Sequence, residues 1–515
     1  MEDISKPALN AVNRDDVKLF PKKFKNTYRN WMENIRDWNI SRQLWWGHQI
    51  PVYYFKSNRK YFVVAENIEK AVEKARKKSG NNSLEEKDLE QENDVLDTWF
   101  SSWIWPISVF DGIRNPTNKD FNYYYPTNDL VTGPDILFFW VARMIVSGFE
   151  FKKLKPFNSV YFTGLVRDKQ GRKMSKQLGN SPDAIKLIEE YGADSVRVGL
   201  MLSSAAGNDL LFDESLCQQG KNFTNKIWNA LRLVNGWEID KEKSQPMVNK
   251  LGIDWYNNKF NNSLELINKN FENYRISDVL MSSYRLVWDD FCSWLLEILK
   301  PDFGEKIDKK SKTELIGLFE KNLKILHPFM PFLTEEIYHN LPDINNSTPL
   351  TVSNWPDMED YNLKSVNEFE TTKEIISQIR NYRKEKNISF KTSLDLYYLP
   401  DKNSPGNIEI IKKIASINKL EESSKENFDM VNSFIIKNYE FFIPLDGGFD
   451  KDAEIKKLKK ELDYNDGFLK SVENKLKNEN FVKNAPDAIV KIEKQKVSDT
   501  KSKIKSLQKS ISELS

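Results

Sequence analysis

Apolar residues in residues 451–515 recur at alternating intervals of three and four. The first run consists of Ile455, Leu458, Leu462, Leu469, Val472 and Leu476, and the second of Val490, Val497, Ile504, Leu507, Ile511 and Leu514. Polar residues stand at three positions of the repeat, namely Asn465, Glu493 and Thr500. Such a repeat predicts two helices packed along one seam. With a turn at residues 478–486, we expect a C-terminal antiparallel coiled coil.

Helical periodicity also dominates residues 216–365, which we expect to form an α-helical bundle. Residues 366–450 instead combine one helical segment with strand-like runs of β-branched and aromatic residues. The helix is expected over residues 368–386, and the strands over 393–398 and 438–444. This mixture predicts a small α/β module between the bundle and the coiled coil.

Strands, glycine turns and helix starts alternate in residues 1–215. A strand ending at Thr132 is followed by a turn and by an expected helix over residues 136–145. A second strand, 160–166, leads through the glycine-flanked loop 171–180 into another helix, with Ser181 as its N-cap. This order predicts an α/β half-domain of the Rossmann type.

The more N-terminal part of this region is less regular. Residues 52–66 read as a short hairpin, and the charged residues 70–92 read as an exposed helix plus a loop.

Two lysines, Lys173 and Lys176, lie three residues apart on the predicted loop. A loop between a strand and a helix can move, so its ammonium groups can close on a polyanion above the strand ends. Lysine is a mobile point charge, which suits phosphates whose charge changes during a reaction. Taken alone, this spacing is found more often in solvated basic loops.

A turn with a carboxylate, Gly133-Pro134-Asp135, precedes the lysine loop in the chain. A strand, a glycine turn and an acidic residue at a helix N-terminus form a layout that binds ribose, whose hydroxyls donate to the carboxylate. The alternative is a plain helix N-cap. Ile136 and Trp140 are spaced i, i+4 and would share one helix face, as core or as a pocket wall.

Composition limits the classes of function that remain. The formal net charge is +2, so any nucleic-acid surface must be local, and residues 451–515 are one such place, with 16 lysines against 11 acidic residues. Two cysteines and three histidines argue against a zinc site and a secreted disulfide scaffold. The N-terminus has no apolar signal-peptide core, and the most apolar segment, 136–146, contains Arg143. We therefore expect a cytoplasmic protein.

Several longer stretches resemble one known family. Residues 171–177 resemble the KMSKS signature of class I aminoacyl-tRNA synthetases, with Gln177 in place of the final serine. Residues 94–102 are similar to the family stretch DVLDTWFSS, and 327–336 to the HPFMPFLTEE element of the anticodon-binding domain. Residues 35–51 are similar to the point where the catalytic domain resumes after the editing insertion. Together with the C-terminal hairpin, these stretches resemble the valyl-type enzymes.

The resemblance implies a valine–tRNA ligase reaction, with ATP and its accompanying Mg²⁺, and with valine and tRNA(Val) as partners. It assigns ATP binding to Gly133, Asp135, Gly164, Lys173, Met174, Ser175 and Lys176, of which Lys173 and Lys176 would be catalytic. It assigns the valine pocket to Trp99, Ile136 and Trp140. Contacts with tRNA are expected from Asn225, Lys226, Arg232, Arg380 and Arg383, on basic or polar helix faces. No metal site, and in particular no zinc, is expected.

The resemblance also assigns domains. Residues 1–215 would be the C-terminal part of a class I catalytic domain, 216–365 the anticodon-binding domain, 366–450 the small α/β module, and 451–515 a tRNA-binding arm.

One departure from the family pattern is large. The chain has no His-x-x-His string, whereas the family carries the HIGH signature in a first half-domain, and most of the editing insertion is also missing. We therefore expect a C-terminal portion that needs an N-terminal half, supplied by a separate chain or by a longer protein. The alternative is a non-catalytic tRNA-binding protein derived from a class I synthetase. A leucyl or isoleucyl relative is disfavoured by residues 97–102 and by the C-terminal hairpin. Gly133-Pro134-Asp135-Ile136 also argues against an isoleucyl enzyme, which typically carries GxDQH.

Overall fold

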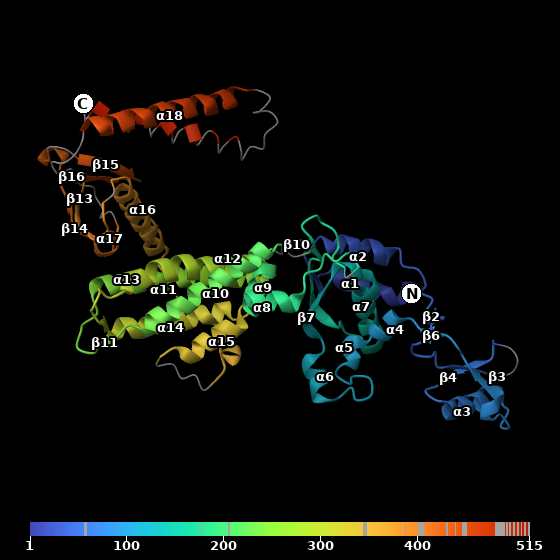
Figure 1. Ribbon diagram of the computed structural model, residues 1–515. Coiled ribbons are helices and arrows are strands. Elements are labelled where there is room, and N and C mark those ends of the chain that lie inside the picture. The colour runs from blue at the N-terminus through green and yellow to red at the C-terminus, as the bar shows by residue number, and fades with distance from the viewer. Residues whose placement is uncertain are drawn as a thin grey trace. The chain divides into compact units, whose positions relative to one another are not determined.

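The computed structural model forms two compact units, which are described separately (Figure 1). The first consists of Met1–Asn225, Leu266–Ser283 and Leu326–Leu333, and the second of Lys226–Glu265, Tyr284–Ile325 and Thr334–Ser515. The structure describes the chain except residues 56–58, 176, 204–206, 343–347, 387, 400–405, 429–430, 438, 445–450, 479–489, 491–492, 494–495, 498–499, 502–503, 506, 509–510 and 513–515, and except the side chains of 451–457 and 461.

A parallel three-stranded sheet organises the first unit. The strands β1 (Lys18–Phe20), β8 (Phe157–Phe162) and β7 (Thr127–Thr132) lie in the order β1-β8-β7. In the register, Thr132 of β7 stands opposite Phe162 of β8. Parallel strands end at the same edge of a sheet, so the segments after β7 and β8 start side by side.

Helices pack with this sheet around one apolar core. They are α1 (Glu2–Asn13), α2 (Phe24–Glu33) and α7 (Arg143–Ser147), and their core residues include Ala8, Met32 and Ile145. The middle strand contributes Val160 and Phe162, both fully buried. A sheet between helices must be apolar along its central strand, as this sequence is.

The segment expected as one α-helix over residues 136–145 is helical but not uniform. It consists of the 3₁₀ turn η2 (Pro134–Ile136), the π-helix η3 (Leu137–Ala142), α7, and a second π-helix η4 (Gly148–Lys152). A π-helix shifts each hydrogen bond by one residue, so the i, i+4 face expected for Ile136 and Trp140 holds only approximately. Such shifts do not change the apolar character of the residues, and the sequence pattern therefore does not reveal them.

The hairpin expected at residues 52–66 is present as β3 (Val52–Phe55) and β4 (Phe62–Val64). A third strand that the sequence reading missed, β5 (Leu89–Gln91), pairs with β3 from within the charged segment read as a loop. The helix α3 (Ile68–Ser79) covers this sheet. Its N-cap is Asn67, whose side chain accepts from the backbone N–H of Lys70 at 3.0 Å.

The rest of the first unit consists of short elements. They are β2 (Ser41–Arg42), η1 (Glu86–Asp88), β6 (Val95–Leu96), α4 (Thr98–Ser102), α5 (Trp105–Ser108), α6 (Lys119–Tyr124), β9 (Val166–Arg167), α8 (Ala184–Tyr191), α9 (Ala193–Leu202) and β10 (Leu210–Leu211). The N-cap expected at Ser181 is instead Asp183, which accepts from the backbone N–H of Ile185 at 2.9 Å. Two suitable capping residues lie close together, and the carboxylate is the stronger acceptor.

Helices form most of the region between residues 214 and 340, and the boundaries of the two units fall inside them. They are α10 (Glu214–Asn235), α11 (Met247–Glu272), α12 (Ile276–Arg285), the π-helix η5 (Leu286–Leu295), α13 (Leu296–Leu299), α14 (Lys309–Leu326) and α15 (Pro331–Asn340). Two short strands, β11 (Ile239–Asp240) and β12 (Ile307–Asp308), pair in parallel. In the second unit Tyr256, Phe291 and Phe319 are fully buried and in ring contact.

The expected small α/β module is present and larger than the sequence indicated. Its sheet has the order β14-β13-β16-β15, from β13 (Leu394–Tyr398), β14 (Ile417–Glu422), β15 (Val431–Ile436) and β16 (Tyr439–Pro444). The helices are α16 (Leu363–Glu385) and α17 (Ile408–Ala415), with 3₁₀ turns at η6 (Leu350–Val352) and η7 (Lys425–Asn427). The guanidinium of Arg383 is buried and donates to four backbone carbonyls, those of Ser389, Thr392, Ala415 and Ser416, at 2.8–3.0 Å.

The helix α18 (Lys451–Lys477) begins the last segment, and described residues between 490 and 512 are also helical. Ion pairs join the two, Lys475 to Glu493 at 3.1 Å and Glu473 to Lys501 at 2.8 Å. The polar positions of the repeat, Asn465, Glu493 and Thr500, are buried, as are the apolar positions Val472, Ile504 and Leu507. None of the described helices combines the length and apolar character needed to cross a membrane.

The Arg383→Met variant should lower the local unfolding free energy of the small module by about 3 kcal/mol, because four backbone carbonyls lose their charged donor. Native-state hydrogen exchange of the β13 and β14 amides measures this. The matched control is Arg380→Met on the same helix, whose guanidinium lies over the Trp294 ring at 5.5 Å. It should cost less than about 1 kcal/mol. Equal losses of unfolding free energy in the two variants would contradict a stabilising role of the Arg383 hydrogen bonds.

Candidate functional site

The segments that follow β7 and β8 begin side by side at one edge of the sheet. The backbone N–H of Thr163 donates to the carbonyl of Thr132 at 2.9 Å, which extends the pairing past both strand ends. A Cβ at Gly133 would lie 2.5 Å from Oδ1 of the Asp135 carboxylate, so a larger residue there would displace this side chain from its present position. The carboxylate of Asp135 is solvent-exposed in the first turn of η2. The turn therefore offers an accessible acceptor at the sheet edge.

Gly164 lies where another chain segment crosses the end of β8. A Cβ at this position would meet the carbonyl oxygen of Asn208 at 1.8 Å. The crossing is fixed by the Gly207 N–H, which donates to the Phe162 carbonyl at 2.9 Å, and by Lys23, whose ammonium donates to the Gly207 carbonyl. Packing alone therefore explains why this position is glycine, apart from the ATP-binding role that the sequence resemblance assigned to it.

The carboxylate of Asp168 holds the first half of the lysine loop. Its Oδ1 accepts from the backbone N–H groups of Gln170 at 3.0 Å and Arg172 at 2.8 Å. Its Oδ2 accepts from the Arg172 guanidinium at 2.8 Å and from the Asn180 side-chain amide at 2.9 Å. The tight turn needs Gly171 at φ +79°. One carboxylate thus joins both ends of the loop.

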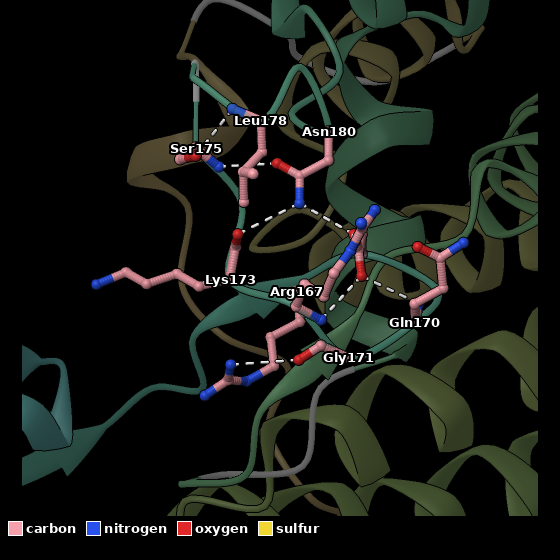
Figure 2. A network of polar contacts seen from close by, with 9 residues as sticks. Arg167, Gln170, Gly171, Lys173, Ser175, Leu178 and Asn180 are labelled. Atoms are coloured by element: carbon pink, nitrogen blue, oxygen red, sulfur yellow. Dashed lines mark hydrogen bonds and ion pairs between the residues drawn. The ribbon is translucent and has the colours of Figure 1, made fainter.

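Asn180 continues this network into the second half of the loop. Figure 2 shows its side chain between Lys173 and Ser175. Its Nδ2 also donates to the Lys173 carbonyl at 3.3 Å, and its Oδ1 accepts from the Ser175 N–H at 2.9 Å. The Ser175 hydroxyl oxygen accepts from the Leu178 N–H at 3.2 Å. The sequence reading assigned no role to Asp168 or Asn180, since a lone Asp and Asn in a loop carry no spacing signal.

These hydrogen bonds lower the pKa of Asp168 to about 2, and the amide of Asn180 is the largest cause, followed by the Arg172 backbone and guanidinium groups. The carboxylate is therefore charged at every pH at which enzymes are normally assayed. The ion pairs beside it, Arg167 with Asp209 and Lys169 with Asp213 at 3.2 Å, tie the neighbouring backbone to the 209–213 segment.

The side chain of Lys173 is exposed although its backbone is held. Its residue forms a β-bridge with Arg167, and Figure 2 shows its side chain extending away from Asn180. Lys176 lies outside the described residues. Met174 turns inward and packs against a buried cluster made of Leu187, Val196, Leu210, Phe212 and Cys217. A cavity of about 370 Å³ on this side is lined by Asp168, Met174 and Asn180, among others. The loop therefore presents a free ammonium group on a fixed backbone.

The three residues assigned to the valine pocket are half-buried. The Trp99 ring stacks on Phe139 with centroids 6.0 Å apart, and the Trp140 indole N–H donates to the Ser102 carbonyl at 3.2 Å. Both contacts join α4 to the helical segment that starts at η2, and Ile136 ends that first turn. The N-cap of α4 is Asp97, which accepts from the Trp99 N–H at 2.7 Å and pairs with Arg42. The two segments therefore lie in contact, with Trp99, Ile136 and Trp140 half-buried.

The residues expected to contact tRNA differ in their accessibility. Asn225 and Arg232 are exposed on α10, and Lys226 and Arg380 are half-buried over the Trp288 and Trp294 rings.

Arg383 is a correction to the expected tRNA contacts. It is only 1 % exposed, and its guanidinium is occupied by backbone carbonyls. The sequence shows a basic helix C-terminus but not the residues that fold back over it. Arg383 therefore belongs to the interior of the small module.

Within the described ranges, no three His, Cys, Asp or Glu side chains gather closely enough to hold a metal ion. A magnesium ion that arrives with ATP phosphates needs no such cage, since it keeps most of its water ligands.

Three family profiles match successive parts of the chain. The family described as "tRNA synthetases class I (I, L, M and V)" matches residues 1–213, the "Anticodon-binding domain of tRNA ligase" matches 254–398, and the "Valyl tRNA synthetase tRNA binding arm" matches 450–515.

Curated relatives cover the whole chain. The valine–tRNA ligases of Christiangramia forsetii and Parabacteroides distasonis are 53% and 49% identical to it, and the chain spans 59% and 58% of their lengths. A solved LeuRS ternary complex from Agrobacterium radiobacter K84 has a TM-score of 0.49 and 19% identity, covering 64% of this chain and 43% of that one. On the sequence relationships, the chain belongs to the class I tRNA synthetases and corresponds to the C-terminal part of the valine–tRNA ligases.

Proposed function

We propose that the chain is the part of a valine–tRNA ligase that contributes the lysine loop, one wall of the amino-acid pocket and the tRNA-binding regions. The observation that carries the proposal is the anchored loop, whose backbone is fixed through Asp168 and Asn180 while the Lys173 ammonium stays exposed. A preorganised charge beside the strand ends is what stabilises a developing anion without reorganisation.

The proposed reaction has two steps. An oxygen of the valine carboxylate bonds to the α-phosphorus of ATP, and the bond from that phosphorus to the β-phosphate oxygen breaks, which gives valyl-adenylate and pyrophosphate. A terminal ribose hydroxyl of tRNA(Val) then attacks the valyl carbonyl carbon, loses its proton and displaces AMP. Lys173 and Lys176 would stabilise the charge that accumulates on the leaving pyrophosphate. Mg²⁺ bound to the phosphates would share that charge.

The other assigned residues would position the substrates. Gly133 lets the ATP ribose approach the backbone, and Asp135 accepts from its hydroxyls, while Gly164, Met174 and Ser175 shape the loop around the nucleotide. Trp99, Ile136 and Trp140 would enclose the valine side chain, because an apolar wall leaves no polar group unpaired against it.

The region assignments follow the same scheme. We propose that 1–215 is catalytic, 216–365 reads the anticodon region, 366–450 is an accessory α/β module and 451–515 is an antiparallel coiled-coil arm on the tRNA. Since the chain spans about three fifths of its relatives' length, the remaining part would supply the HIGH signature. A non-catalytic tRNA-binding role is the second candidate, favoured by the lysine-rich arm.

Valine-dependent ATP–pyrophosphate exchange tests the catalytic proposal, with the N-terminal part of a relative supplied. Lys173→Ala should reduce the exchange rate by roughly 100-fold or more, because the Lys173 ammonium group would no longer stabilise the charge that develops on the leaving pyrophosphate. Lys169→Ala is the matched control on the same loop, since that lysine pairs with Asp213, and it should change the rate less than about threefold. No exchange in the complemented wild-type protein would favour the binding role.

Asp168→Asn should loosen the loop, because the amide that replaces the carboxylate is a weaker acceptor and has one oxygen for the four donors. The readout is hydrogen exchange at the Arg172 and Ser175 amides, which should become at least about tenfold faster at pH 7. In the wild-type chain the pKa of Asp168 is about 2, below the usual value of about 3.9. Its contribution to loop order is therefore complete above pH ~4 and lost only as pH falls through ~2. Unchanged amide exchange in the variant would contradict the claim that Asp168 holds the loop backbone.

Binding of tRNA to the arm should depend on salt. Replacing the exposed lysines Lys459, Lys460 and Lys470 by glutamine should weaken tRNA binding and reduce the slope of log K against log salt, by about 0.7–0.9 for each phosphate that is no longer neutralised. The control neutralises exposed Asp463 by asparagine, which should strengthen binding slightly. An unchanged slope in the lysine variant would place the tRNA elsewhere.

A further inference from the structure

One wall of the proposed valine pocket stands on a very short helix. The helix α4 has five residues and carries Trp99, whose ring stacks on Phe139 with centroids 6.0 Å apart. The first four N–H groups of any helix have no partner inside it, so contacts at the two ends set the position of a helix this short. At the C-terminal end the Trp140 indole N–H donates to the Ser102 carbonyl at 3.2 Å. The contacts at the N-terminal end therefore also decide where Trp99 stands.

The N-terminal end of α4 is held by the carboxylate of Asp97. Its Oδ1 accepts from the Trp99 N–H at 2.7 Å, and its Oδ2 accepts from the guanidinium of Arg42. Asp97 is only 6 % exposed. A carboxylate that is removed from water in this way needs a charged partner, and Arg42 supplies it. The ion pair is thus separated from the backbone of Trp99 by one carboxyl group.

The guanidinium of Arg42 is itself held by its own segment. Its Nη1 donates to the carbonyls of Asn39 and Ser41, both at 2.7 Å. The segment is anchored beside α4, because β2 pairs with β6 and because the Asp97 N–H donates to the Ile40 carbonyl at 2.7 Å. A planar guanidinium can direct several donors in fixed directions, which an ammonium group cannot do. The segment therefore holds the carboxylate that caps α4.

A second arginine lies behind the same wall. The guanidinium of Arg143 lies 3.5 Å from the Trp38 ring centroid and 5.8 Å from that of Phe139. Burial lowers the pKa of Arg143, while the charge of Asp97 opposes this shift and the charge of Arg42 adds to it. The Asp97 carboxylate thus interacts with both cations. Without Arg42 it would be attracted toward Arg143 alone, and the cap of α4 would move with it.

We propose that Arg42 is a positioning residue for amino-acid selectivity, which fixes Trp99 through Asp97 and so sets the width of the valine pocket. The inference rests on the proposed ligase function. Isoleucine is one methylene larger than valine, and an apolar pocket gains about 10- to 200-fold in selectivity from such a difference. That gain requires a wall that does not yield to the larger side chain.

Pyrophosphate exchange with valine and with isoleucine tests the inference, on the chain supplied with the N-terminal part of a relative. Arg42→Met should lower the ratio of kcat/KM for valine to that for isoleucine about tenfold, because the loosened wall admits the larger side chain. Arg42→Lys should restore part of the ratio, since an ammonium group can still pair with Asp97. A residue that only supports the fold would lower both values equally, and an unchanged ratio in Arg42→Met would overturn the inference.

Further variants test the chain of contacts. Asp97→Asn keeps an oxygen for the Trp99 N–H but removes the charge, and it should lower the ratio to a similar extent. The double variant with Arg42→Met should be no worse than either single variant, because the two residues act as one pair. Additive losses would contradict this. The control is Arg59→Met in the same unit, where Arg59 lies 3.6 Å from Glu92, and it should leave the ratio unchanged.

Hydrogen exchange at the Trp99 amide separates this inference from the proposed function. This amide should exchange about tenfold faster in Arg42→Met than in the wild-type chain, while the Val160 amide in the sheet keeps its rate. If the complemented wild-type chain shows no valine-dependent pyrophosphate exchange, the ligase proposal fails, and the Trp99 amide alone decides whether Arg42 positions this helix. An unchanged rate at the Trp99 amide would overturn the inference in either case.

Discussion

The parallel pairing of β7 with β8 is the constraint on which the candidate site depends. It sets Thr132 beside Phe162, so the Gly133–Asp135 turn and the Gly164 crossing leave the sheet at the same edge. The two segments keep their relative positions, because β8 cannot shift along β7 without displacing the fully buried side chains of Val160 and Phe162. The turn and the crossing, which are about thirty residues apart in sequence, are thereby brought to one edge of the sheet, which is the usual location of ligands in open α/β sheets.

The lysine loop combines a fixed backbone with a free side chain. Asp168 and Asn180 supply most of the hydrogen bonds that close it, and Met174 seats it on an apolar cluster. A loop held mainly by side-chain hydrogen bonds and one apolar contact has few buried apolar contacts, so it is among the parts that open at low free energy. Only the backbone of Lys173 is held in advance, so its exposed side chain keeps its own rotamer freedom.

Much of the architecture could be predicted from the sequence, because the periodicity of apolar residues indicates its helices and strands. The heptad positions of residues 451–515 are an example, and even the breaks at Glu493 and Thr500 are buried polar positions in the structure. Other features depend on contacts that no local pattern encodes. The π-helices between Leu137 and Lys152 keep the same apolar residues as an α-helix, and β5 is a charged segment that becomes a strand only by pairing with β3. Arg383 reads as a surface base, but residues 389–416 bury it. Asp168, which closes the candidate site, has no motif of its own.

The central claim is that the strand ends and the lysine loop form one nucleotide site. Hydrogen–deuterium exchange tests it most directly, on the chain supplied with the N-terminal part of a relative, with and without valine and a nonhydrolysable ATP analogue. Slower exchange confined to residues 132–135 and 164–180, with β3 to β5 unchanged, is the predicted result. Unchanged exchange in both segments while the analogue is bound would contradict the account.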